Sequence, residues 1–173
     1  MTEKPVFYAY LMSEKITFTP IGIIHSPFTE LKGMPIQPAG EKSAPGTVEI
    51  YSEYAPGLKD LDGFSHIYLI FYLHQSRFSS LTVAPFLDDH PHGVFATRAP
   101  NRPNAIGLSL VRLNRVEDNI LHIENLDILD GSPLLDIKPY VASFEESTDL
   151  RVGWLEGNLD KIRKKTSDGR FTE

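Results

Sequence analysis

The chain has 173 residues, of which 41% are hydrophobic and 23% charged, and these values are typical of one folded domain with its own core. It contains no cysteine, which excludes a disulfide scaffold, a thiolate metal site and a cysteine nucleophile. The net charge of −6 argues against a protein that coats nucleic acid, yet residues 98–115 hold four arginines and no acidic residue, so one part of the surface can bind a polyanion.

Neither membrane insertion nor export is indicated. The longest apolar run, residues 67–73, is far shorter than the roughly 20 residues that a membrane-spanning helix needs. The first fifteen residues contain a short apolar patch but no small-residue cleavage site. We therefore expect a soluble, cytoplasmic protein with no membrane partner.

Segments typical of β-strands dominate the chain. Residues 16–24 are rich in β-branched side chains, with Pro20 at an edge or a bend, and residues 47–51 alternate between apolar and polar. Residues 64–75 are apolar on both faces, which predicts a central strand. Further strands are predicted at 93–97, 107–116 and 119–126, and the last two are joined by a hairpin turn at 116–119.

Helix signals are weaker, and two loops are long. A short helix is predicted near residues 54–61, and Leu155, Leu159 and Ile162 are spaced as on one helical face. Residues 26–46 and 76–93 are predicted as loops of a length that is usually functional or mobile. The expected fold is all-β, a barrel or strongly curved sheet over residues 16–144 with short helices. An N-terminal segment, 1–15, and a small C-terminal extension, 145–173, flank it.

Residues 96–107, ATRAPNRPNAIG, combine two arginines with two prolines and two asparagines. Pro-Asn steps favour turns or extended backbone, so we expect Arg98 at the end of a strand and Arg102 in a braced loop. A rigid surface loop with solvated arginines fits this pattern, and so does a loop that binds an anion. Stiffness suits the second interpretation, because groups ordered in advance lose less entropy on binding.

Residues 125–140, NLDILDGSPLLDIKPY, contain a strong turn at DGSP. At least one of Asp127 and Asp130 is expected to bond to nearby backbone. Asp136, Lys138 and Tyr140 share one face if the segment is extended. A carboxylate, an ammonium and a phenol together could orient a nucleophile or accept a proton, and the alternative is an exposed ion pair of little energetic value.

The loop DDHPHG, residues 88–93, places two carboxylates beside His90 and His92. Such a set could bind a cation. No third ligand follows at a convincing spacing, so adventitious binding is a better interpretation than a catalytic metal, and we expect no metal site.

Four stretches together resemble one family. The stretches IGIIHSPF (21–28), GFSHIYLIFYLHQ (63–75), GVFATRAPNRPNAIGLSLV (93–111) and LDILDGSPLLDIKPY (126–140) are similar in order and spacing to the TsaA-like family, also called TrmO. The resemblance implies a β-barrel methyltransferase that uses S-adenosylmethionine. Family members methylate N6 of N6-threonylcarbamoyladenosine, next to the anticodon of certain tRNAs, as homodimers that need no metal.

Carried over to this sequence, the resemblance implies that the cofactor is bound by Gln37, Pro38, Ala39, His74, Gln75, Arg98, Leu108, Asp130, Gly131 and Ser132. Arg102 would bind the tRNA backbone or the threonyl carboxylate, with Asn104 beside it. Our hypothesis for catalysis is that the face of Asp136, Lys138 and Tyr140 holds the nucleophile and that one of the three aids its loss of a proton.

Two other functions stay open from the sequence. One is a module that only binds S-adenosylmethionine, or a methyltransferase that acts on a different small substrate. The other is a metal-dependent hydrolase that uses His90 and His92. Binding of the cofactor with and without tRNA separates the first from a tRNA methyltransferase, and activity that survives a chelator dismisses the second.

Overall fold

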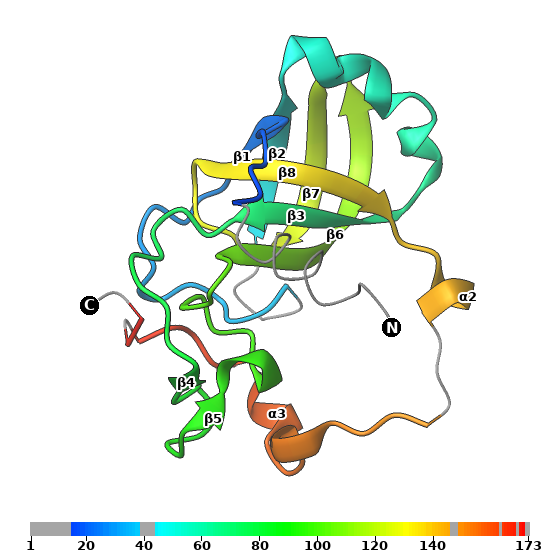
Figure 1. The fold of residues 1–173 in the computed structure, drawn as a ribbon. Coiled ribbons are helices and arrows are strands. Elements are labelled where there is room, and N and C mark those ends of the chain that lie inside the picture. Colours follow the sequence, from blue (N-terminus) through cyan, green and yellow to red (C-terminus); the bar gives the residue numbers. More distant parts are fainter. Residues whose placement is uncertain (1–14, 39–43, 146–148, 163, 169, 172–173) are drawn as a thin grey trace, which may run out of the picture.

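A computed structural model of the protein describes residues 15–38, 44–145, 149–162, 164–168 and 170–171. Its centre is a closed barrel of six antiparallel strands in the order β1-β2-β7-β6-β3-β8 (Figure 1). The strands are β1 (Gly22–His25), β2 (Ala44–Ile50), β3 (His66–Tyr72), β6 (Ile106–Glu117), β7 (Ile120–Leu126) and β8 (Ser132–Pro139). The predicted all-β barrel is confirmed, and closure leaves the sheet without a free edge.

The remaining elements are short. Strands β4 (Thr82–Val83) and β5 (His92–Gly93) form a separate two-stranded sheet. The helical segments are η1 (Ser52–Leu58), η2 (Leu61–Gly63), η3 (Val94–Ala96), α2 (Ala142–Glu145), η4 (Gly153–Leu155) and α3 (Leu159–Ile162). None of the helices in the described ranges has the length and hydrophobicity that crossing a bilayer requires.

Alternation along the strands fills the barrel. In β3, Ile67, Leu69 and Phe71 are buried inside, whereas Tyr72 is exposed on the outer wall. The same alternation buries every second residue from Gly107 to Leu113 in β6, and Leu121 and Ile123 in β7, so the interior is a packed apolar core. The predicted central strand and the hairpin between β6 and β7 are confirmed, and the hairpin turn contains Asp118 with a φ of 54°.

Four local predictions differ from the structure, and one of them is the loop predicted at 76–93, which contains the short strands β4 and β5. The first strand is Gly22–His25, which is shorter than the predicted 16–24 and ends one residue later. The predicted strand 93–97 is wrong, because η3 occupies Val94–Ala96 and the backbone turns there with Val94 buried and Phe95 exposed. The helix predicted near 54–61 is instead two 3-10 segments, η1 and η2, the first of which contains Pro56.

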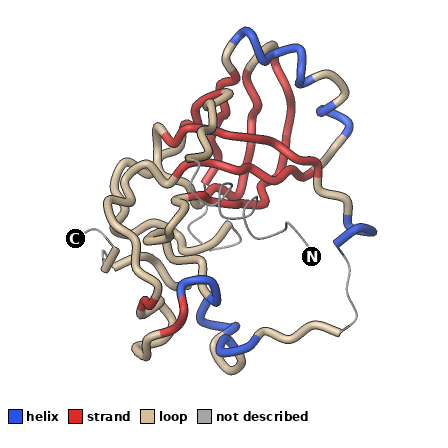
Figure 2. The backbone as a smooth tube through the Cα atoms, in the orientation of Figure 1, coloured by secondary structure: helices blue, strands red, loops and turns tan. Residues whose placement is uncertain are grey.

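The long loops and the C-terminal segment gather at one end of the barrel (Figure 2). The C-terminal segment reaches the first loop through a bridge between Pro35 and Thr166, and the backbone N–H of Ser167 donates to the carbonyl of Met34 at 2.9 Å. It reaches η3, which directly follows the second loop, through Trp154, whose indole N–H donates to the carbonyl of Ala96 at 2.8 Å. The loops and this segment therefore pack against one another at the barrel end.

Candidate functional site

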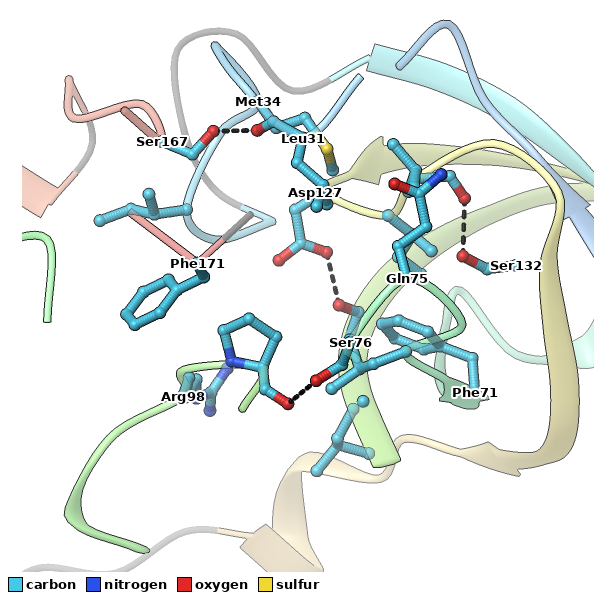
Figure 3. A pocket seen from close by; sticks show the side chains of 18 of the residues that line it. Leu31, Met34, Phe71, Gln75, Ser76, Arg98, Asp127, Ser132, Ser167 and Phe171 are labelled. Carbon is cyan, nitrogen blue, oxygen red and sulfur yellow. Dashed lines mark hydrogen bonds between the residues drawn. The ribbon is translucent and has the colours of Figure 1, made fainter. Parts of the chain in front are cut away.

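A cavity of about 350 Å³ lies where β3 and β7 end and β6 and β8 begin (Figure 3). Its wall is mostly apolar with a few polar groups, a composition that is typical of small-molecule sites. The barrel, both long loops and the C-terminal segment all contribute to it. The polar residues of the wall are His74, Gln75, Ser76, Thr97, Arg98, Arg102, Ser109, Asp127, Ser132 and Ser167.

Gly107 makes room for one wall of the cavity. A Cβ atom at this position would lie 2.3 Å from Cζ of Phe71, far inside contact distance. Phe71 and Gly107 face each other across β3 and β6, and both line the cavity. Any side chain here would push the Phe71 ring out of its place, so glycine is required by close approach.

His74 lines the cavity, and its contacts determine which ring nitrogen carries the proton. The hydroxyl of Ser132 donates to the carbonyl of Leu129 at 2.7 Å, so its single proton is used. Ser132 Oγ also lies 3.2 Å from Nδ1 of His74, and this nitrogen must therefore be the donor. Burial lowers the pKa of His74, with the charge of Asp130 acting in the opposite direction. The neutral ring then keeps its proton on Nδ1 and offers the lone pair of Nε2.

Asp130 and Gly131 hold the turn that places Ser132. The Asp130 carboxylate accepts the backbone N–H of Ser26 at 2.9 Å, and the N–H of Gly131 donates to the carbonyl of Ile24 at 2.9 Å. Gly131 has a φ of 74°, which favours glycine. The expected bond from a turn aspartate to backbone is thus made across the barrel end, to the loop that follows β1.

Asp127 follows β7 directly and lines the cavity. Its carboxylate accepts the hydroxyl proton of Ser109, in β6, over 2.5 Å. Burial raises the pKa of Asp127 to about 6, while the Ser109 hydrogen bond and the charge of Arg98 act in the opposite direction. This group is therefore ionised at neutral pH but more basic than an ordinary aspartate.

The two arginines of residues 96–107 have different surroundings. Nη1 of Arg102 donates to the carbonyls of Val94, Thr97 and Ala99 at 3.0–3.3 Å. Arg102 is thus the brace of its own loop. Arg98 is exposed and lines the cavity, and it makes no hydrogen bond to another residue in the described ranges. Its guanidinium is available to a ligand.

Comparisons with known proteins agree with this architecture. The profile of the tRNA-methyltransferase O N-terminal domain matches residues 23–146, which include all six barrel strands except the first residue of β1. The chain belongs to the TrmO family.

The relatives fall into two groups by length. A protein of Pyrococcus abyssi named "Probable S-adenosyl-L-methionine-binding protein" is 54% identical over 156 residues, which are 90% of this chain and 85% of that protein. The tRNA (adenine(37)-N6)-methyltransferase of Escherichia coli K12 is 37% identical over 149 residues, 80% of this chain and 63% of the enzyme. A crystal structure of TrmO from Pseudomonas aeruginosa aligns with a TM-score of 0.68 at 38% identity, over 82% of this chain and 63% of that one. This chain therefore spans less than two thirds of the Escherichia coli methyltransferase and of the Pseudomonas aeruginosa TrmO.

Half of the cofactor residues implied by the family lie on the cavity wall: His74, Gln75, Arg98, Leu108 and Ser132. Asp130 and Gly131 lie outside the wall and shape it through the turn. Gln37 and Pro38 directly follow Met34, Pro35 and Ile36, which do line it, and Ala39 lies outside the described residues. The cofactor role of these residues stays a prediction.

Sequence reasoning missed the C-terminal part of the wall. Ser167 and Phe171 line the cavity, and the hydroxyl of Ser167 donates to the carbonyl of Leu31 in the first loop. Phe171 packs edge-on against Phe86 with ring centroids 5.0 Å apart. The C-terminal extension is thus part of the cavity wall, and no motif in the sequence indicates it.

The predicted catalytic face lies outside the cavity. Asp136 and Lys138 share the outer face of β8, as expected, and form an ion pair of 2.9 Å with both side chains largely exposed. Tyr140 packs edge-on against Tyr68 with centroids 5.8 Å apart. Burial, followed by the charge of Glu145, raises the pKa of Tyr68, and the positive charge of Arg98 opposes this. None of the three predicted residues lines the cavity, and their catalytic role stays a prediction.

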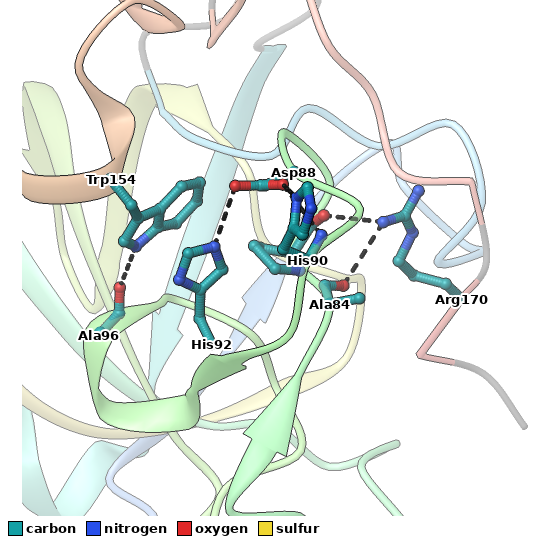
Figure 4. Close-up of polar contacts among 8 residues, drawn as sticks. Ala84, Asp88, His90, His92, Ala96, Trp154 and Arg170 are labelled. Atoms are coloured by element: carbon teal, nitrogen blue, oxygen red, sulfur yellow. Dashed lines mark hydrogen bonds and ion pairs between the residues drawn. The ribbon is translucent and has the colours of Figure 1, made fainter.

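The DDHPHG loop is organised by one carboxylate (Figure 4). Asp88 Oδ1 lies 2.9 Å from Nδ1 of His90, and its Oδ2 lies 3.1 Å from Nε2 of His92. The His90 backbone N–H, followed by the two imidazoles, holds the pKa of Asp88 far below its usual range. In the part of the chain that the structure describes, no three His, Cys, Asp or Glu side chains are grouped as metal ligands.

A second cavity, of about 580 Å³, adjoins the first and shares Ser76, Arg102 and Ile106 with it. Its wall includes Asn104, three basic residues and three aromatic residues: Lys15, Arg77, Arg102, Phe18, Tyr72 and Phe78. Among the described residues, no acidic side chain lines it. Arg102 and Asn104, predicted to bind substrate, thus lie on a basic surface, and that role stays a prediction.

Proposed function

We propose that this chain is an S-adenosylmethionine-dependent tRNA methyltransferase that methylates N6 of N6-threonylcarbamoyladenosine next to the anticodon. The observation that carries this proposal is the cavity at the barrel end, where His74, Gln75, Arg98, Leu108 and Ser132 from four chain segments come together. Relatives named for binding S-adenosylmethionine and for methylating tRNA adenine support it.

The cavity suits a donor of this kind. A volume of about 350 Å³ falls in the range of sites for one small molecule, and His74 offers a neutral acceptor while Arg98 offers a free cation. When bound, S-adenosylmethionine supplies an activated methyl group. Methyl transfer then depends mainly on position and alignment, which can lower a barrier by about 7–11 kcal/mol in good cases.

The second cavity supports tRNA as the other substrate. Single-stranded nucleic acid is bound through positive groups that contact phosphate and aromatic rings that stack on bases. Lys15 and Arg77 supply the charge, and Phe18 and Phe78 are 59% and 46% exposed. Because this surface adjoins the donor cavity, an anticodon loop held here would bring one nucleoside to the methyl group. A tRNA substrate also implies a cytoplasmic location.

A homodimer is part of the proposal. Tyr72, Ile106 and Leu108 are 43%, 37% and 52% exposed on neighbouring positions of β3 and β6. All three also line one or both cavities, so a partner packed here would border the same site. Apolar side chains gathered on an outer barrel wall are typical of an interaction surface. A second copy of the chain is the partner expected there. Light scattering of the purified protein measures its molar mass in solution and thereby distinguishes a dimer from a monomer.

The experiment that tests the function is nucleoside mass spectrometry. The protein is incubated with S-adenosylmethionine carrying a labelled methyl group and with tRNA that either contains or lacks N6-threonylcarbamoyladenosine. We expect the labelled methyl group on N6-threonylcarbamoyladenosine only. The labelling should be the same in the presence of a chelator. Cofactor binding without any labelled nucleoside would favour a module that binds S-adenosylmethionine alone or acts on another small substrate.

A further inference from the structure

One acidic residue lines the donor cavity in the described part of the chain, and it is Asp127. Its side chain points into the cavity among residues from both loops and from the barrel (Figure 3). It belongs to none of the groups to which a role has been assigned so far, since the predicted catalytic residues lie on the outer face of β8. A carboxylate in this position requires an explanation, because apolar walls disfavour its charged form.

The carboxylate is held in one orientation. The hydroxyl of Ser109 reaches across from β6 and donates to Oδ1, and the backbone of Ile128, the next residue, is fixed by a 2.7 Å bond from the hydroxyl of Ser26. Ser109 is 2% exposed and therefore cannot turn away to water. Among the described residues, Ser109 is the one side chain that donates to this carboxylate, and its other contact is the Asp127 backbone N–H, so a carboxylate oxygen remains for a ligand.

Asp127 has chemical surroundings that suit proton transfer. The pKa of about 6 places the group near neutral pH, where a base is both ionised and able to hold a proton. The charge of Arg98, which lines the same cavity, is the weakest of the effects that lower the pKa of Asp127, and it acts without a direct hydrogen bond among the described residues. An aspartate on the exposed outer wall, such as Asp136, lacks this burial.

We propose that Asp127 is the general base of methyl transfer, with Ser109 as its positioning residue, and this rests on the proposed function. The N6 nitrogen is a weak nucleophile, because the carbamoyl group and the purine both withdraw its lone pair. As the nitrogen attacks the methyl carbon, the C–S bond breaks and its electron pair returns to sulfur. The N–H pair stays on nitrogen while the proton passes to the free oxygen of Asp127.

The charges in this step balance. The sulfonium loses its positive charge and the carboxylate loses its negative charge, so two opposite charges in a poorly solvated cavity are removed together. The products are S-adenosylhomocysteine, the methylated nucleoside and a protonated Asp127. No oxidant, reductant or further reactant is needed, and the proton is later released to solvent.

The test compares Asp127→Asn with the wild-type protein and with Asp62→Asn, a matched change at an exposed aspartate in η2. Single-turnover methylation of tRNA containing N6-threonylcarbamoyladenosine is measured from about pH 5 to about pH 9. The wild type and Asp62→Asn should show a rate that rises with an apparent pKa near 6. Asp127→Asn should lose at least about 100-fold in rate and lose this rise.

Two further measurements separate the alternatives. S-adenosylhomocysteine binding, measured by calorimetry, should change less than about threefold in Asp127→Asn. Ser109→Ala removes the bond that lowers the pKa of Asp127, so its rate curve should move to higher pH.

The inference is wrong if Asp127→Asn keeps the rate and pH curve of the wild type, or if it loses S-adenosylhomocysteine binding, which would make Asp127 a cofactor ligand. A wild-type protein that does not methylate this tRNA at any pH would overturn the proposed function itself.

Discussion

Trp154 stacks on His92, with the ring centroids 4.6 Å apart and the ring planes 26° from parallel. His92 is held in turn by Asp88, and the indole N–H of Trp154 donates to the carbonyl of Ala96 (Figure 4). One aromatic side chain thus fastens the C-terminal segment to the loop that continues to Arg98. Since the same segment lines the donor cavity with Ser167 and Phe171, this contact links the extension to the site.

Trp154→Ala should therefore lower stability and donor affinity together. Loss of a stacked, half-buried aromatic ring should reduce the free energy of unfolding by about 2 kcal/mol. Thermal unfolding and calorimetric titration with S-adenosylhomocysteine measure the two effects. Trp154→Phe is the control, since it keeps an aromatic ring but loses the donor to Ala96. Its stability and its affinity should lie between those of the wild type and those of Trp154→Ala. An alanine variant with unchanged affinity would show that the C-terminal segment does not support the cavity.

Gly107→Ala should damage the cavity from inside the barrel. The added methyl group would meet the Phe71 ring, and overpacking of this kind costs about 1–3 kcal/mol. Gly57→Ala, in η1, is the matched control, because a Cβ there meets no atom within 4 Å. We expect weaker binding of S-adenosylhomocysteine and a lower melting temperature in the first variant only. Equal behaviour of the two variants would contradict the close approach of Gly107 and Phe71.

Arg98 and Arg102 should respond in opposite ways to substitution. Arg102→Lys loses the planar donor group that serves three backbone carbonyls, so it should lower the free energy of unfolding by about 2 kcal/mol. Arg98→Lys should leave stability within about 0.5 kcal/mol and weaken ligand binding about tenfold or more. Chemical denaturation and calorimetry give the two readouts. If Arg98→Lys unfolds more readily than Arg102→Lys, the assignment of brace and ligand group is reversed.

The sequence contains enough information to predict the barrel, because alternation along strands such as β3 and β7 is a local property. It also indicates the turn at Asp130 and Gly131 and the braced loop around Arg102. It could not reveal that Arg102 itself is the brace, or that Ser167 lies against Leu31, since these contacts join positions without a shared pattern. For a related reason the sequence could not show that Asp127 lines the cavity, since its position there depends on barrel closure, and the catalytic role of Asp136 stays a prediction.

Stability should depend on pH through Asp127. Its pKa in the folded protein is about 6, above the ordinary value, so the folded state binds the proton more tightly than the unfolded state does. The free energy of unfolding should therefore decrease by up to about 3 kcal/mol as the pH rises from about 4 to about 6, and should stay constant above that pH. Asp127→Asn has no charge to bury and should melt several degrees higher than the wild type at pH 8. The difference should shrink toward pH 4, and a constant difference would contradict the raised pKa.

The outer face of β8 gives the last test, because it separates two candidate sources of catalytic groups. If Asp136, Lys138 and Tyr140 hold the nucleophile, Asp136→Asn and Lys138→Ala should abolish most methylation and leave S-adenosylhomocysteine binding intact. Their ion pair is exposed, so stability should change by less than about 1 kcal/mol. The measurement is the rate of labelled methyl transfer at saturating donor, for these variants and for Asp127→Asn. It shows whether the outer face of β8 or Asp127 supplies the catalytic group. Unchanged turnover in Asp136→Asn and Lys138→Ala would remove this face from the mechanism. Loss of turnover in these two variants and in Asp127→Asn would mean that the outer wall and the cavity act on the same nucleoside.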